Sequence, residues 1–249
     1  RLWIETDEEI IAKLVADFAD RKLYIADGHH RYETALNYRN YCRENGISKP
    51  GDPQDFQMIY LVDMEHPGLV VFPTHRLVRD LPNFDKEAVL EKCSEFFYID
   101  EKEGTDTMEE DLKKLYDEGK KAFGFYCGKG EWFLLTLKNI DIMSQMLPNV
   151  SKASQSLDVS VLHTLILEKI FGIDKENMAK QINLTYTKFF TEAIDGVDKG
   201  EFQCSFVLNP TRVTEIRDVA AAGEKMPQKS TYFYPKMITG MVMNNLGVD

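Results

Sequence analysis

The sequence predicts a mixed α/β fold in which mixed sheets are flanked by helices. Segments with the apolar spacing of amphipathic helices alternate along the chain with short apolar segments that are typical of buried strands. Hydrophobic residues make up 43% and charged residues 29% of the 249 residues, a balance typical of a globular protein with a buried core. There is no run of about 18 apolar residues, so we expect no membrane-spanning segment.

The helices are predicted from apolar residues that recur every three or four positions. The first follows Thr6-Asp7-Glu8-Glu9, a capping-box pattern typical of a helix N-terminus. The longest begins at Ser156 and ends before Gly172, because glycine commonly terminates helices. The expected helices cover residues 7–20, 30–44, 85–96, 107–119, 156–171, 188–198 and 213–222.

The strands are predicted from short apolar segments bounded by turn residues. Residues 23–26, the turn at Asp27-Gly28 and the following helix form a strand-turn-helix unit. Residues 122–127 and 131–137 form a hairpin. The other expected strands cover residues 56–64, 69–72, 97–99, 182–186 and 202–208, and residues 223–236 are expected to be irregular.

A chain of this length can form one large domain or two packed ones. We expect residues 1–150 to form an α/β domain that carries the Asp27-Gly28 turn, and residues 151–249 to form a C-terminal α/β domain or a continuation packed on the first. Four cysteines without CxxC spacing predict neither a zinc site nor a disulfide framework. With no visible export signal, a cytoplasmic location is expected.

The charge distribution favours a small anionic ligand over a nucleic acid. The net charge of −11 disfavours DNA or RNA as the main partner. Two segments are nevertheless locally basic: residues 21–43 carry five Lys or Arg against two acidic residues, and residues 209–240 carry five against three. No membrane partner is expected, and the oligomeric state is left open.

The turn at Asp27–Arg31 is the first candidate site. Glycine permits the backbone of a tight turn, and the first amides of the following helix lack partners within the helix. These amides and the helix dipole favour a phosphate or carboxylate, and Arg31 adds a bidentate donor. His29 and His30 can donate or accept protons, and Glu33 is placed to cap the helix start.

Two other interpretations of this turn stay open. Asp27 can be an ordinary N-cap residue, with His29 and His30 as surface residues. Metal binding by both histidines is disfavoured, because adjacent side chains at a helix start diverge.

Lys229, Ser230, Thr231 and Lys236 form the second candidate site. A Walker A loop is excluded because GxxxxGK[ST] is absent, yet hydroxyl and ammonium groups on one loop can still bind phosphate oxygens. The alternative is an ordered surface loop whose aromatic residues pack on the core.

Three single residues complete the candidates. Arg76 follows a strand and can add a cation, although a solvated side chain is the simpler interpretation. Asp158 lies near a helix start, where it is either a cap or a ligand for Mg²⁺ or a base. His163, in the same helix, is more simply a structural histidine than a catalytic one. No cysteine-based arrangement and no GxSxG motif supports a hydrolase.

Three separated blocks of sequence resemble the DUF1015 family. They are LYIADGHHRYETA at residues 23–35, SLDVSVL at 156–162 and GEKMPQKSTYFYPK at 223–236. The resemblance implies that this chain is the C-terminal portion of a longer protein, with a further N-terminal part before residue 1. The family name itself implies no activity.

The Asp-Gly-His-His-Arg turn also resembles the corresponding turn of the ParB, sulfiredoxin and free-serine kinase superfamily. That likeness implies phosphate contacts from Gly28, His30 and Arg31, and an acceptor or Mg²⁺ role for His29 or Asp27. The catalytic base is left open between Glu33, Asp158 and the N-terminal part outside this chain.

The resemblance therefore implies a nucleotide-dependent phosphotransferase that acts on a small hydroxyl metabolite, with free serine as one candidate. ATP or ADP, with CTP as an alternative, and Mg²⁺ are the expected cofactors, and the expected partner is a small phosphate-bearing molecule. The alternative is a non-catalytic regulatory module that binds a nucleotide or metabolite.

Overall fold

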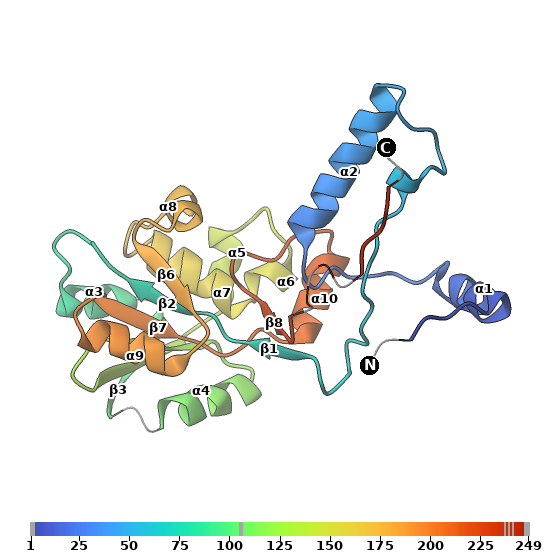
Figure 1. Cartoon of the computed structure of the whole chain (residues 1–249). Coiled ribbons are helices and arrows are strands. Elements are labelled where there is room, and N and C mark those ends of the chain that lie inside the picture. The colour runs from blue at the N-terminus through green and yellow to red at the C-terminus, as the bar shows by residue number, and fades with distance from the viewer. Residues whose placement is uncertain (1–2, 105–106, 237, 239, 241, 247–249) are drawn as a thin grey trace. The chain divides into compact units, whose positions relative to one another are not determined.

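The structure is a computed structural model that describes residues 3–104, 107–236, 238, 240 and 242–246 (Figure 1). The chain divides into two compact units. The first comprises Arg1–Met58 and Asn244–Asp249, and the second comprises Ile59–Met243. None of the helices in the described ranges is both long and apolar enough to cross a membrane.

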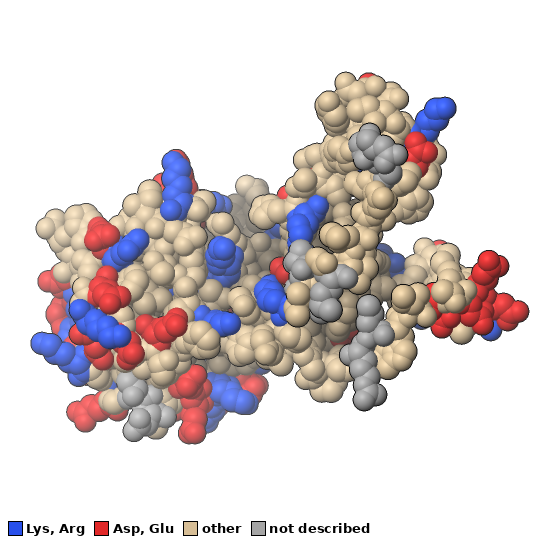
Figure 2. All heavy atoms as spheres, viewed as in Figure 1, with Lys and Arg blue, Asp and Glu red and all other residues tan. Residues whose placement is uncertain are grey.

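The first unit contains both helices expected near the N-terminus. They are α1 (Glu8–Phe18) and α2 (His29–Glu44), and a short 3-10 helix, η1 (Pro53–Asp55), follows them. Asp7, rather than Thr6, caps α1, because its side chain accepts hydrogen bonds from the amides of Glu9 and Ile10. Glu8 and Glu9 lie in the first turn of this helix, which agrees with the preference of a helix N-terminus for negative charge, and acidic side chains gather around α1 in Figure 2.

Two strands expected in the sequence are not formed. Within the described residues, neither 23–26 nor 56–64 pairs with another strand, so no strand precedes the Asp27-Gly28 turn there. Leu23 and Ile25 are exposed. The physical reason is that a strand exists only where a partner takes up its N–H and C=O groups, and apolar alternation does not specify that partner.

The second unit is built on a six-stranded sheet whose pairings are all antiparallel. The strand order is β3-β5-β4-β7-β2-β6, and the sheet takes strands from both sides of residue 150. The bounds are β2 (His75–Val78), β3 (Phe97–Glu103), β4 (Ala122–Tyr126), β5 (Glu131–Leu137), β6 (Leu184–Thr187) and β7 (Cys204–Val207). The mixed α/β class is thereby confirmed.

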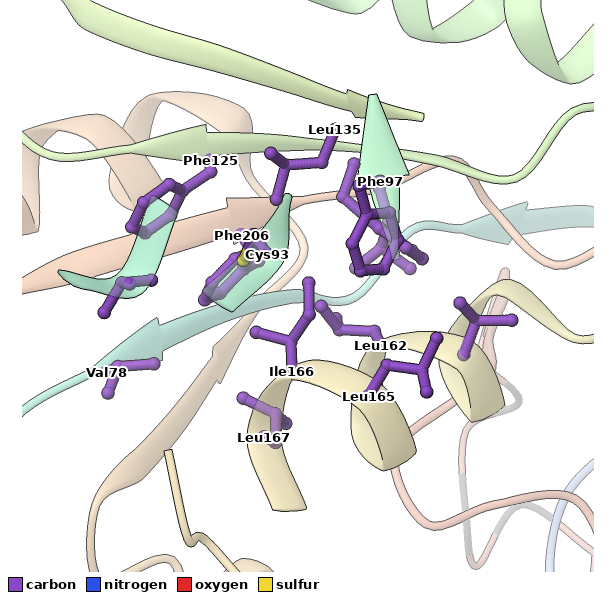
Figure 3. Close-up of a cluster of buried hydrophobic side chains, with 14 of the residues drawn as sticks. Val78, Cys93, Phe97, Phe125, Leu135, Leu162, Leu165, Ile166, Leu167 and Phe206 are labelled. Atoms are coloured by element: carbon purple, nitrogen blue, oxygen red, sulfur yellow. The ribbon is translucent and has the colours of Figure 1, made fainter. Parts of the chain in front are cut away.

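Both faces of this sheet are buried, because its central strands carry apolar residues at successive positions. On one face Phe125 and Phe206 stack with ring centroids 4.8 Å apart, and the helical segment with Leu162 and Ile166 covers them (Figure 3). On the other face Trp132 packs with residues of α4 (Met108–Asp117) and α9 (Phe190–Asp198). The helices therefore hold the sheet rigidly between two layers.

The remaining helices lie at the ends and along the edges of these layers. They are α3 (Lys86–Cys93), α5 (Ile142–Met146), α6 (Lys152–Gln155), α7 (Asp158–Val161), α8 (Lys175–Lys180) and α10 (Val213–Ala221). The long helix expected from Ser156 is divided: α7 continues into a π-helix, η2 (Leu162–Glu168), in which the amide of Lys169 bonds to the carbonyl of Thr164 at 3.2 Å. Such π-helical turns often occur at functional sites.

A second, two-stranded sheet corrects the expectation that residues 223–236 are irregular throughout. β1 (Val70–Phe72) pairs antiparallel with β8 (Tyr232–Tyr234). Phe72 contacts the rings of Tyr232 and Tyr234 edge-on. The aromatic residues of the closing segment thus pair with a distant strand, which their local sequence does not indicate.

Candidate functional site

The Asp27–Arg31 turn has the backbone expected of an anion-binding helix start. Gly28 occupies the N-cap position of α2 with φ 85°, a left-handed conformation that favours glycine. Gly28 has no side chain with which to cap the first amides of this 16-residue helix. Its first amides therefore point outward, where they and the helix dipole favour a negatively charged group.

The charged side chains around this turn form loose pairs. Arg31 Nη2 lies 3.5 Å from Asp27 Oδ2, and His30 Nδ1 lies 3.5 Å from the Oε2 atom of Glu33, the residue expected to cap the helix start. The Arg31 side chain is 70% exposed and that of His30 is fully exposed, whereas His29 is half-buried. Exposed pairs of this length are weak and exchange readily, so a phosphate can compete for Arg31.

Arg76 lies in very different surroundings, in β2 of the second unit. Its side chain is fully buried, so the solvated alternative is wrong for this residue. Its guanidinium donates to the backbone carbonyls of Thr74 and Lys229, the latter at 3.2 Å, and lies 3.1 Å from His163 Nε2. Arg76 Nε has no hydrogen-bond partner among the described residues.

Burial and the positive charge of Arg76 determine the pKa values of the cluster formed by Arg76, His75 and His163. Burial lowers the pKa of Arg76 to about 10 and that of neighbouring His75 to about 4. Burial and then the charge of Arg76 hold the pKa of His163 well below its usual value. Both histidines are therefore neutral at physiological pH, while Arg76 stays charged.

Of the second candidate loop, Lys229–Lys236, only a part contacts the Arg76 cluster. Lys229 contributes its carbonyl to Arg76, and the carbonyl of Ser230 accepts from the Thr211 hydroxyl at 3.1 Å. Ser230 is buried and its Oγ has no partner within the described residues, whereas Thr231 is half-buried. Lys236 Nζ lies 5.0 Å from the Tyr232 ring centroid. The structure thus brings Arg76 and Lys229, two of the predicted site residues, into contact within this unit.

Asp158 lies in a buried charge cluster. Its Oδ1 is 2.9 Å from Lys121 Nζ, which also lies 3.3 Å from Glu215. Burial raises the pKa of Asp158 more than Lys121 lowers it. A cation at Asp158 would have to displace the Lys121 ammonium, and no group of three or more His, Cys, Asp or Glu in the described parts of the chain is arranged to hold a metal.

A cavity of about 540 Å³ opens beside the Arg76 cluster, within the second unit. His163 and Tyr186 line it, and both contact Arg76: the Tyr186 ring centroid lies 5.4 Å from the guanidinium carbon. Sequence reasoning treated His163 as structural and did not single out Tyr186. No local motif marks either residue, since β6 and η2 meet at Arg76 only through the tertiary fold.

The two candidate segments, Asp27–Arg31 and Lys229–Lys236, belong to different units. The roles assigned to their individual residues stay predictions. What the structure does describe is an exposed helix start that carries Arg31, and a buried arginine beside a cavity in the second unit.

Comparison with solved structures finds several proteins of low sequence identity. A free serine kinase in complex with AMP has a TM-score of 0.44 and 15% identity, with 92% of this chain and 81% of that chain covered. A point mutant of a free serine kinase in complex with ADP has a TM-score of 0.43 and 14% identity over the same shares. A conserved hypothetical protein from Pyrococcus furiosus has a TM-score of 0.42 and 19% identity, with 84% and 68% covered.

A sequence search of curated proteins finds no match. The model of a protein family does match: it is described as "Protein of unknown function (DUF1015)" and it covers residues 1–160. This match includes the Asp27–Arg31 turn and the first five residues of the block at 156–162. Since it spans more than half of the 249 residues, the chain belongs to the DUF1015 family.

Proposed function

We propose that the chain is a nucleotide-dependent phosphotransferase that binds the phosphates at the Asp27–Arg31 turn and acts on a small hydroxyl metabolite such as free serine. The observation that carries the proposal is the start of α2, where the N-cap residue Gly28 has no side chain over the first amides and Arg31 lies in the first turn. Phosphoryl transfer depends mainly on positioning and on cationic stabilisation of the phosphate oxygens, which these groups supply.

The roles of the neighbouring side chains follow from their chemistry. Gly28, His30 and Arg31 bind phosphate oxygens, and Asp27 or His29 orients the acceptor or a Mg²⁺ ion. Mg²⁺ keeps most of its waters and takes one or two carboxylates, so Asp27 and the nucleotide suffice to hold it. Asp27 would then leave Arg31, its partner at 3.5 Å, to the phosphate.

The transfer step is an in-line displacement at the terminal phosphorus atom. The acceptor oxygen forms the new P–O bond, the bond to the leaving nucleotide breaks, and the hydroxyl proton passes to a base. Glu33 is the candidate base of the turn: it is half-buried, and its carboxylate lies 3.5 Å from His30. The buried Asp158 is less suited, because Lys121 occupies its carboxylate.

Calorimetry with ATP, ADP and CTP in the presence of Mg²⁺ tests the binding half of the proposal. We expect the wild type to bind at least one nucleotide and Arg31→Ala to weaken that binding by about tenfold or more, as loss of a charge-assisted hydrogen bond predicts. Arg39→Ala is the matched control: Arg39 lies further along α2 and donates to Asn40. Absence of nucleotide binding by the wild type contradicts the proposal.

Phosphorus NMR of the same protein with serine and other hydroxyl metabolites tests the transfer half. We expect a phosphomonoester signal to grow with the wild type and to be lost with Glu33→Gln, while nucleotide binding is kept. Binding without transfer to any acceptor contradicts the phosphotransferase and favours a regulatory module instead.

A further inference from the structure

Residues of the second unit alone form the cavity beside Arg76, and the proposed phosphate site at Asp27–Arg31 contributes none of them. Its volume of about 540 Å³ falls within the ~300–1,000 Å³ that small-molecule sites commonly have. Apolar side chains supply much of the lining, namely those of Leu147, Val150, Met178 and Pro227. Such a lining suits a ligand with an apolar body.

The hydrogen bond between Arg76 and His163 fixes what the imidazole can offer to that ligand. Arginine has donors and no acceptor, so Nη2 donates to His163 Nε2 across 3.1 Å. The neutral imidazole must then carry its proton on Nδ1. No described residue accepts a hydrogen bond from Nδ1, and His163 lines the cavity, so the ring presents a donor to an occupant.

Tyr186 adds a second donor that the protein leaves unused. Its hydroxyl is buried and has no hydrogen-bond partner among the described residues, although Tyr186 lines the same cavity. A buried hydroxyl without a partner costs free energy. An acceptor on a bound molecule would remove that cost.

The charge of Arg76 favours a negatively charged ligand. The guanidinium is fully buried, and within the described residues no carboxylate lies within ion-pair distance of it. A buried charge without a counter-ion attracts an anion across the low-dielectric interior. His163 and Tyr186, which both contact Arg76, lie between this charge and the cavity.

The two carboxylates of the lining do not neutralise Arg76. Glu224 accepts hydrogen bonds from the amide and hydroxyl of Ser151, at 2.7 and 2.8 Å, and from the hydroxyl of Ser154. Glu168 is partly buried in η2. Two carboxylates nearby nevertheless favour one negative charge on the ligand over several.

Two lysines extend the positive charge toward the solvent. Lys175 and Lys225 are exposed residues of the same lining. Their charges are screened by water and are worth less than the buried guanidinium, but they share its sign. The two lysines balance the two glutamates of the lining, so the buried charge of Arg76 is what disfavours a cationic ligand.

We infer that this cavity binds a small organic monoanion, a carboxylate on an apolar body, whose oxygens accept hydrogen bonds from His163 Nδ1 and the Tyr186 hydroxyl. Arg76 is a positioning residue: it holds the imidazole in the donating tautomer and supplies the attractive charge. The inference does not depend on phosphate binding at the Asp27–Arg31 turn.

Fluorine NMR with three probes of one shape tests the inference on the whole chain. The probes are para-trifluoromethylbenzoate, the corresponding benzyl alcohol and the corresponding benzylamine, which differ in charge at one group. We expect the carboxylate to bind at least about tenfold more tightly than the alcohol, and the amine not to bind, as hydrogen bonds to charged groups predict. Equal binding of carboxylate and alcohol, or binding of none of the three, overturns the inference.

Variants then locate the bound carboxylate. We expect His163→Phe to lower its affinity about tenfold and Tyr186→Phe to lower it by a smaller factor, as loss of one hydrogen bond each predicts. The exposed Lys92→Ala should have no effect. Should His163→Phe fail to fold, as judged by circular dichroism, Tyr186→Phe decides alone, since it removes only the orphaned hydroxyl. Unchanged affinity in the folded variants overturns the inference.

The variant Arg31→Ala tests the carboxylate site independently of the proposed nucleotide site. We expect the variant to keep carboxylate binding even where it loses nucleotide binding. If Arg31→Ala weakens the carboxylate probe as much as Tyr186→Phe does, the cavity is not an independent site and the inference is overturned.

Discussion

Arg31 and Arg76 carry the same charge in opposite surroundings. Arg31 stands at the exposed start of α2, 3.5 Å from Asp27, and is 70% exposed. Arg76 is fully buried in β2, where it donates to two backbone carbonyls and to His163 but meets no carboxylate in the described chain. Solvent screens the first charge, whereas the surrounding protein must stabilise the second.

This difference separates two ways of attracting an anion. At the turn, backbone amides and exposed side chains can bind a phosphate and release it again. Beside the cavity, a rigid sheet and a π-helix hold a charge and two hydrogen-bond donors in place before any ligand arrives. The first arrangement suits a nucleotide that turns over, and the second suits tight recognition of one small group.

The two arginines should differ most clearly in how much each contributes to the stability of the fold. We expect Arg76→Ala to lower the free energy of unfolding by about 3 kcal/mol, because it leaves a cavity and three acceptors without their donor. Arg31→Ala should leave the urea midpoint unchanged within error, since its side chain is exposed. Chemical denaturation followed by circular dichroism measures both, and an Arg76→Ala protein as stable as the wild type would contradict a structural role for the buried guanidinium.

The buried histidine next to Arg76 should make stability depend on pH. The pKa of His75 is about 4 in the folded chain and about 6.5 when unfolded, so between these values only the unfolded chain takes up the proton. Stability is therefore complete above about pH 6.5 and is lost as the pH falls toward 4, with about 2 kcal/mol lost from this residue by pH 5.

The measurement is the urea midpoint from pH 7 to pH 4.5 in the wild type and in His75→Asn. Asparagine keeps an acceptor near the position of Nδ1, which accepts from the Leu208 amide at 3.4 Å. We expect the variant to lose less stability on acidification. His66→Gln, outside the buried cluster, is the control, and equal slopes in all three proteins would show that His75 does not titrate as proposed.

Much of the second unit was predictable from sequence, because its elements follow local patterns. The hairpin of β4 and β5, the helices α3, α4, α9 and α10, and the mixed α/β class all agree with apolar periodicity. The first unit shows the limit of that method. Residues 23–26 and 56–64 have strand-like composition but no paired strand in the described structure, since pairing depends on residues far away in sequence.

The two candidate sites also differ in how far the sequence predicts them. The Asp27–Arg31 turn is local, so glycine followed by His-His-Arg was enough to predict a tight turn into a helix start. The Arg76 cluster joins residues from β2, η2 and β6 with the carbonyl of Lys229. Lys229 lies 153 positions after Arg76 in the sequence. Burial of an arginine cannot be seen in a strand-end sequence, and for that reason solvation was the simpler expectation.

The smallest expected effect concerns the backbone of the turn itself. Gly28 and Gly46 flank α2, and both adopt a positive φ, 85° and 70°. Alanine at either position should cost about 1 kcal/mol of stability in the helix, because a side chain disfavours this conformation. The two positions differ in their neighbours: a Cβ at Gly28 would lie 2.9 Å from Arg31 Nη2, whereas nothing lies within 4 Å at Gly46.

Gly28→Ala must therefore displace the Arg31 guanidinium, and Gly46→Ala need not displace any group. We expect Gly28→Ala to weaken nucleotide binding about as much as Arg31→Ala does, while Gly46→Ala binds like the wild type despite a similar loss of stability. Calorimetry of both variants against the same nucleotide distinguishes strain at the binding turn from strain in the helix. Wild-type affinity in Gly28→Ala would mean that the phosphates bind elsewhere, because neither the open helix start nor Arg31 beside it would then be needed.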